Sequence, residues 1–189
     1  MRRFSYKKSV QALNLIAVWG GGSMNKMKAI KTMWLADRYH LRKYGRPIFN
    51  DLYTAMENGP VLSATRDILQ RNSLGVSQEI LDYSEQFLSS NQYNYKSVNT
   101  PAKQVFSDSD LEALEIIFKT YGSLGHYPLR DLSHDFPEWQ RWEDGLKKKL
   151  YKSHEMDYND FFKSPQGDHQ LFVADDDLET VHKLFKKEE

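Results

Sequence analysis

Two backbone breaks within residues 29–70 constrain the fold of this chain more than any other sequence feature. Before the first break, apolar residues recur every three to four positions, as they do on the side of a helix that faces a core; these are Ile30, Met33, Trp34 and Leu41. Gly45 can adopt the left-handed conformation that ends a helix, and Pro47 cannot continue one. The sequence therefore predicts a core helix that ends at Gly45.

The second break, Asn58-Gly59-Pro60, separates a short extended segment from another helix. The extended segment, residues 52–56, suits a strand. Because proline is favoured in the first turn of a helix, we expect Pro60 to open the helix that carries Leu62, Ile68 and Leu69.

Further helices are predicted on both sides of this stretch. Apolar spacing indicates helices at residues 9–19 and 77–88. Ser107 or Asp108 can cap the start of another helix, because either side chain can accept a hydrogen bond from the first turn. A short helix at residues 128–133 precedes Pro137, which should begin the next one.

One strand is predicted outside that stretch. Residues 91–98 alternate tyrosines with polar residues, which is typical of a strand. We expect this strand to pair with residues 52–56. The predicted fold is then mainly α with a small antiparallel β element, in the α+β class.

The chain is long enough for one domain with an extension. We expect residues 1–150 to form a compact multi-helix domain and residues 151–189 to form a C-terminal extension that ends in an amphipathic helix. That helix has an acidic start at Asp175–Asp177, a basic end, and an apolar stripe made of Leu178, Val181, Leu184 and Phe185.

Cysteine is absent, which excludes disulfides, thiolate nucleophiles and cysteine-ligated metals. The basic, then apolar, N-terminus superficially resembles a secretory signal, but Asn14 interrupts the apolar stretch and no small-x-small cleavage site follows. No run approaches the roughly 20 apolar residues of a membrane span. These features favour a cytoplasmic protein with no membrane partner.

Charge is distributed unevenly along a chain whose net charge is zero. Residues 1–50 contain eleven Lys and Arg and one acid, Asp37, so they carry +10 and residues 51–189 carry −10. A basic face for an acidic partner or nucleic acid is one interpretation. The favoured alternative is that the two halves fold together and offset each other, because no cluster is dense enough for an arginine-rich binding tract.

Asp37 is the first candidate for chemistry, since it lies near the apolar stripe of its helix. A general base working with His40 or His134 is the functional interpretation. The favoured one is a buried acceptor that ties the helix to a backbone turn or to Arg46, because buried polar groups are usually satisfied internally. We expect His134 to join two helices by hydrogen bonds and Trp139 to fill the corner between them.

Two acids belong to the short extended segment before the second break. Asp51 and Glu57 are both expected to face solvent.

Three blocks of sequence resemble a known family. ADRYHLRKYGRP, AMENGPV and LSHDFPEW match, in order and spacing over roughly residues 10–145, the Panacea domain of SocA-like antitoxins from bacterial and phage toxin–antitoxin pairs. The resemblance implies a non-enzymatic protein, with no cofactor or metal, that neutralises a cognate toxin encoded by the adjacent gene. The residues that carry the resemblance are expected to be structural: Asp37, His40, Gly45, Arg46, Pro47, Gly59, Pro60, Val61, His134, Pro137 and Trp139.

The family also suggests a variant of this function, and two functions of other classes are alternatives to it. In the variant, the protein is an adaptor that delivers the toxin to a protease. One rival is a hydrolase or nuclease that uses Asp37, His40 and His134. Another is nucleic-acid binding by the basic N-terminal helices, which we do not prefer because no recognition-helix pattern is present.

Partner contacts are expected from aromatic and apolar side chains, because interface energy concentrates in such residues. The candidates are Tyr93, Tyr95, Phe161, Phe172, Leu178 and Phe185.

Overall fold

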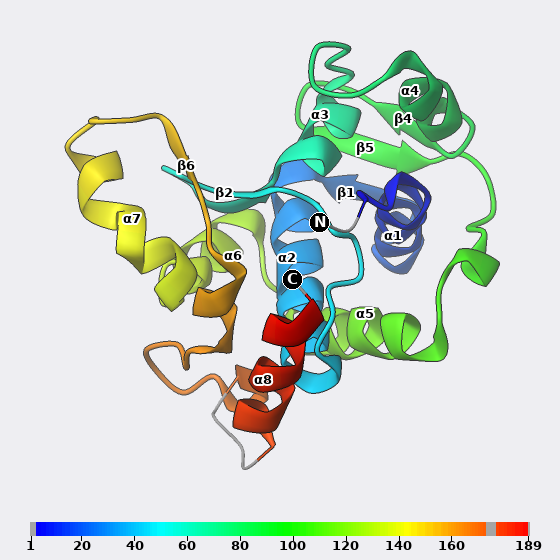
Figure 1. Ribbon diagram of the computed structural model, residues 1–189. Coiled ribbons are helices and arrows are strands. Elements are labelled where there is room, and N and C mark those ends of the chain that lie inside the picture. Colours follow the sequence, from blue (N-terminus) through cyan, green and yellow to red (C-terminus); the bar gives the residue numbers. More distant parts are fainter. Residues whose placement is uncertain (1–2, 173–176, 189) are drawn as a thin grey trace.

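Helix α2 (Lys26–Tyr44) is the centre of the computed structural model, which describes residues 3–172 and 177–188. Most of its residues are buried, and other elements surround it on several sides (Figure 1). The Asn25 side chain caps its start by accepting a hydrogen bond from the Lys28 N–H at 3.2 Å. Gly45, with φ of 69°, ends it, and its N–H donates to the Leu41 carbonyl at 2.9 Å. The predicted helix end is therefore confirmed.

Seven more helices of the described residues pack around α2 or its neighbours. They are α1 (Tyr6–Trp19), α3 (Ser63–Gln70), α4 (Gln78–Glu85), α5 (Asp108–Tyr121), α6 (His126–Ser133), α7 (Pro137–Lys147) and α8 (Leu178–Glu188). Short 3-10 turns are η1 (Lys103–Val105), η2 (Tyr158–Phe162) and η3 (Gln170–Phe172). The predicted class, mainly helical with small antiparallel sheets, is confirmed.

Local sequence chemistry explains several helix starts. Ser107 and Asp110 form a reciprocal capping box at the start of α5, where each side chain accepts from the other's backbone N–H. Pro137 occupies the first turn of α7, where its missing N–H costs nothing. Both starts agree with the sequence prediction.

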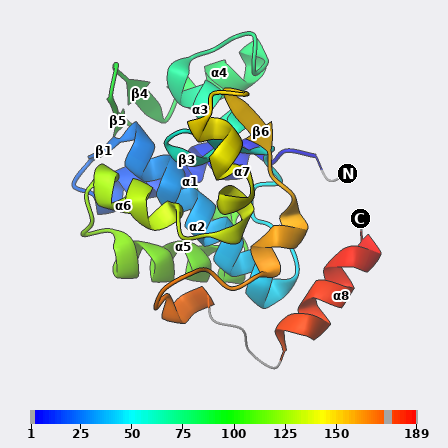
Figure 2. The same ribbon diagram turned by 90° about the vertical axis from the view of Figure 1, so that its left-hand side faces the viewer.

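Two separate three-stranded antiparallel sheets flank the top of α2. One has the order β1-β5-β4, from β1 (Ser23–Asn25), β5 (Asn94–Ser97) and β4 (Leu88–Ser90). The other has the order β3-β2-β6, from β3 (Gly59–Leu62), β2 (Tyr53–Met56) and β6 (Ser153–Glu155). Figure 2 shows β6 on the same side of the molecule as α6 and α7.

Two predictions about these strands are wrong. The strand within residues 91–98 does not pair with residues 52–56, because β5 lies between β1 and β4 in the other sheet. Pro60 does not open a helix either: it pairs with Ala55 in the β2–β3 hairpin, and α3 begins at Ser63. Proline is tolerated there because β3 is an edge strand.

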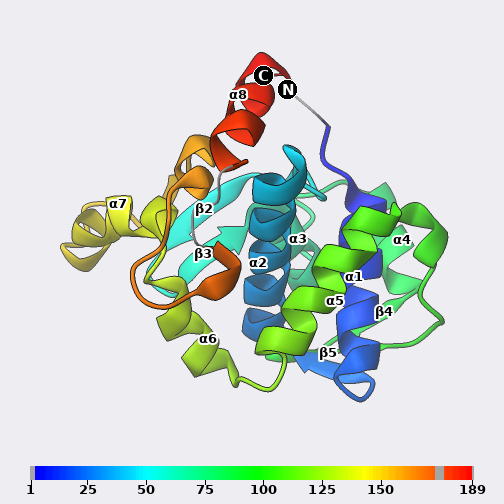
Figure 3. The same ribbon diagram turned by 90° about the horizontal axis from the view of Figure 1, so that it is seen from below.

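The C-terminal extension packs against the rest of the chain rather than standing apart. Strand β6 adds to β2, and the Arg42 guanidinium of α2 donates to the carbonyls of Phe162 at 2.6 Å and Phe172 at 2.7 Å. Helix α8 lies beside the C-terminal end of α2 (Figure 3). The expected acidic residues Asp175 and Asp176 fall outside the described residues.

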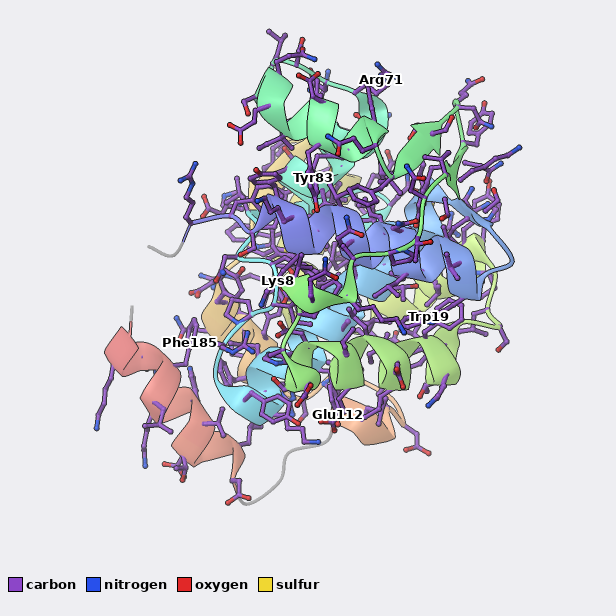
Figure 4. The ribbon with its side chains drawn as sticks, turned by 90° about the vertical axis from the view of Figure 1, so that its right-hand side faces the viewer. Lys8, Trp19, Arg71, Tyr83, Glu112 and Phe185 are labelled. Carbon is purple, nitrogen blue, oxygen red and sulfur yellow. The ribbon has the colours of Figure 1, made fainter. Side chains whose placement is uncertain are left out.

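Helix α1 lies between α4 and α5 (Figure 4). Lys8 of α1 forms an ion pair with Asp110 of α5 at 2.5 Å. On the other side, Gln11 of α1 donates to the Tyr83 hydroxyl of α4 at 2.9 Å. Within the described part of the chain, no helix is long and apolar enough to cross a membrane.

Candidate functional site

Asp37 lies on α2, and its side chain reaches the loop that follows the helix. The residue is 1% exposed, and its carboxylate accepts hydrogen bonds from the Ile48 N–H, the Phe49 N–H at 3.3 Å and the Tyr53 hydroxyl. Burial raises the pKa of Asp37 to about 7, although these hydrogen bonds oppose the rise. Asp37 thus ties the helix to a backbone turn, and Arg46 is not among these partners.

His40 and Arg46 connect α2 to the start of α5. The His40 Nδ1 lies 2.7 Å from the Arg46 carbonyl, so it carries the proton, and Nε2 lies 3.0 Å from the Ser109 hydroxyl. Arg46 forms an ion pair with the buried Asp110 at 2.9 Å. Burial lowers the pKa of His40, which favours the neutral ring. All these groups have internal partners, as a structural role requires.

Gly59, in the β2–β3 hairpin, lies against Lys31 of α2 and Ser133 of α6. Its φ is +91°, and a Cβ at this position would overlap the Ser133 hydroxyl and lie 2.6 Å from the Lys31 Nζ. The Lys31 side chain is buried and donates to the Pro60 carbonyl at 2.7 Å. Burial, followed by repulsion from Arg130, moves the pKa of Lys31 well below its usual value. Only glycine fits both the backbone conformation and the space.

His134 and Trp139 meet by stacking. Their ring centroids are 3.8 Å apart with an interplanar angle of 5°, and the Trp139 indole N–H donates to the Met56 carbonyl at 2.8 Å. The expectation that His134 joins two helices by hydrogen bonds is wrong for Nε2, which is buried without a hydrogen-bond partner. Burial lowers the pKa of His134, so the neutral ring is favoured.

These positions do not assemble a catalytic set. Asp37 faces the loop after α2, His40 faces α5, and His134 stacks on Trp139, with no hydrogen bond linking the three among the described residues. Within the same residues, no three His, Asp or Glu side chains are grouped as metal ligands. A nucleophile or base with converging partners is therefore not formed by the residues that the sequence singled out.

Arg38 and Glu138 form a buried ion pair that the sequence interpretation missed. Both side chains are 0% exposed, and the Arg38 Nε lies 2.8 Å from the Glu138 carboxylate. The Arg38 guanidinium also packs over the rings of Phe136 and Phe172. Burial raises the pKa of Glu138, and Arg38 opposes the rise. One signal was available, because Arg38 lies four residues after Trp34 on the apolar side of α2.

The prediction that Asp51 faces solvent is wrong. The residue is 3% exposed and accepts from the N–H groups of Ala64 and Thr65, each at 2.9 Å, so it holds the first turn of α3 instead of facing solvent. Glu57 is exposed, as expected.

Four of the six expected partner contacts are not surface residues. Tyr95, Phe161, Phe172 and Phe185 are buried, so the expectation that they lie at the surface is wrong. Tyr95 lies in the middle strand of its sheet, and its hydroxyl donates to the Leu13 carbonyl at 2.9 Å. Tyr93 is 66% exposed and Leu178 is half-buried. Their role in partner binding stays a prediction.

Tyr93 borders a cavity of about 790 Å³, which we call the basic cleft. Its lining comes from the starts of α2 and α6, the β2–β3 and β4–β5 turns, the end of α7 and part of α3. The basic residues that line it are Lys26, Lys31, Arg66, His126, Lys149 and Lys152, and among them Lys31 is the buried lysine whose pKa lies well below its usual value. Glu57 is the one acid in the lining described here. The basic cleft is thus a hollow in which basic side chains outnumber acidic ones.

Comparison with known proteins places most of these features in one matched span. The family model described as "Antitoxin SocA-like, Panacea domain" matches residues 30–140. No curated protein and no solved structure matches the chain. The matched span runs from the start of α2 to the first turns of α7, and includes both backbone breaks.

Proposed function

Because the chain belongs to the SocA-like Panacea-domain antitoxin family, we propose that it neutralises a cognate protein toxin by binding it directly. The toxin would be the product of the adjacent gene, and the two proteins would meet in the cytoplasm. In this proposal the chain makes and breaks no covalent bond. Binding gives a complex in which the toxin is held inactive.

One observation carries the proposal beyond the family name. The polar residues of the family blocks contact other parts of the same chain: Asp37 holds the loop after α2, and His40 and Arg46 hold α5. Buried groups that are satisfied in this way stabilise a scaffold and are not available to a substrate. A scaffold with an open, charged cleft suits a protein whose role is recognition.

The test is to express the neighbouring open reading frame with and without this chain. We expect growth arrest by the neighbour alone and normal growth when the two are expressed together. The purified proteins should elute as one complex in gel filtration. Growth arrest that persists on co-expression, with both proteins present in soluble form, would contradict the proposal.

The same experiment separates direct neutralisation from the adaptor variant. In direct neutralisation, the amount of toxin in the cell stays constant or rises while growth recovers. An adaptor would lower the amount of toxin, and relief of arrest would require an active cellular protease. Immunoblots of the toxin over time distinguish the two.

A further inference from the structure

We infer that the basic cleft is the docking site for an acidic segment of the partner protein. The inference rests on the proposed function, since it names the surface and the chemistry of that binding. It concerns the cleft lined by Lys26, Lys31, Arg66, Lys149 and Lys152.

The first support is unneutralised positive charge. Among the described residues, Lys26, Lys149 and Lys152 have no carboxylate within ion-pair distance, whereas Arg66 pairs with Asp67 at 3.1 Å. Some exposed lysines elsewhere do pair, as Lys43 does with Glu112 at 2.6 Å. A hollow lined by one sign of charge concentrates opposite charge. An acidic partner would supply the carboxylates that the cleft lacks.

The second support comes from two helix starts. The N-terminal residues of α2 and α6 both line the cleft, and neither helix has an acid in its first turn. Gly125, the N-cap of α6, offers no side chain to accept from the free N–H groups of that turn. The positive ends of the two helices therefore add to the charge of the lysines.

The wall of the cleft also carries side chains that suit a polypeptide. Tyr93 and Tyr127 line it at 66% and 56% exposure, and Leu150, 73% exposed, lies beside Lys149 and Tyr151 of the lining. Exposed aromatics are the residues in which interface energy concentrates. The amides of Asn58 and Gln92 in the lining can pair with a peptide backbone.

The size of the basic cleft and the distribution of charge on the chain favour a polypeptide over nucleic acid. A cavity of about 790 Å³ accommodates a few side chains but not a duplex. The cations surround this hollow, whereas nucleic acid is bound along an extended basic stripe. The chain as a whole carries 26 acids against 26 Lys and Arg, so a long polyanion would meet repulsion outside the cleft.

The test compares two triple variants with the same change in charge. The cleft variant is Lys26→Glu, Lys149→Glu and Lys152→Glu. Its matched control is Lys7→Glu, Lys96→Glu and Lys103→Glu, three exposed lysines that lie outside the cleft lining. Thermal unfolding of each purified protein verifies that both variants fold, and binding of the purified neighbouring toxin is measured by calorimetry.

We expect wild type and the control variant to relieve growth arrest and to bind the toxin. The cleft variant should lose relief, with a dissociation constant raised about 100-fold, because like charges would face each other in the complex. Changing acids of the toxin to lysine should restore binding to the cleft variant. Wild-type affinity should fall as salt rises.

Other outcomes overturn the inference, and each is distinguishable. If wild type itself fails to relieve arrest, the proposed function fails and the inference falls with it. If the cleft variant relieves arrest as well as the control, the proposed function stands and the cleft is not the docking site. If wild type binds a 20-nucleotide single-stranded DNA that the cleft variant does not bind, while both bind the toxin equally, the cleft is a nucleic-acid site.

Discussion

Replacement of Gly59 by alanine tests a close packing contact in the family region. The added methyl group would overlap the Ser133 hydroxyl and lie 2.6 Å from the Lys31 Nζ, in a place where neither neighbour faces open solvent. The residue would also have to keep a φ of +91°, which a side chain disfavours. Two separate costs therefore apply at one position.

The magnitude follows from these costs. The left-handed conformation costs a non-glycine residue about 1–2 kcal/mol, and forcing a methyl group into a filled space costs about 1–3 kcal/mol more. Gly59→Ala should thus lower the free energy of unfolding by about 2–5 kcal/mol, out of roughly 5–15 kcal/mol for a typical domain. That loss is large enough to leave part of the protein unfolded at physiological temperature.

Gly21→Ala is the matched control. Gly21 has a φ of +87°, but a Cβ there would meet no atom within 4 Å, so the control carries the backbone cost without the overlap. Urea denaturation should give a loss of about 1–2 kcal/mol for Gly21→Ala and a clearly larger one for Gly59→Ala. Adding Ser133→Ala should recover part of the difference. Equal losses for the two glycine variants would refute the packing argument.

Three further predictions concern buried charge and the C-terminal extension. Urea titrations should show that the stability advantage of wild type over Asp37→Asn shrinks by roughly 3 kcal/mol from pH 5 to pH 8. Folding raises the pKa of Asp37 from 3.8 to about 7, so the stabilisation that comes from the protonated carboxyl group is lost as pH rises. An unchanged difference would show that the pKa is not raised. Arg38→Met should cost about 3–5 kcal/mol by leaving Glu138 buried without its partner, and adding Glu138→Leu should recover most of it in the same assay. A chain that ends at Leu150 should melt roughly 10 °C lower by circular dichroism, because Arg42 loses the carbonyls it contacts; an unchanged melting temperature would mean that residues 1–150 are stable alone.

Features set by local chemistry were predictable from the sequence. The end of α2 at Gly45, the cap of α5 at Ser107 and the start of α7 at Pro137 each depend on one residue and its immediate neighbours. The acceptor role of Asp37 was also within reach, because a carboxylate near an apolar stripe must find donors. Which donors it finds depends on how the loop folds back.

Features set by distant partners were not predictable. Strand β1 is only three residues long and forms because β5 lies beside it, so residues 23–25 alone carry no strand pattern. The burial of Phe161 and Phe172 has a similar origin. Aromatic residues serve both cores and interfaces, and without clean periodicity in residues 151–172 nothing in the sequence decides between them.

Arg42 recognises main-chain oxygens of the C-terminal extension, and this has an evolutionary consequence. Every amino acid presents the same carbonyl, so the positions that supply Phe162 and Phe172 to Arg42 can exchange side chains of similar bulk without weakening those hydrogen bonds. Selection would then preserve the backbone path of the C-terminal extension while its amino-acid sequence changes. Relatives could share the extension in three dimensions and still look unrelated beyond residue 140, where the family match stops.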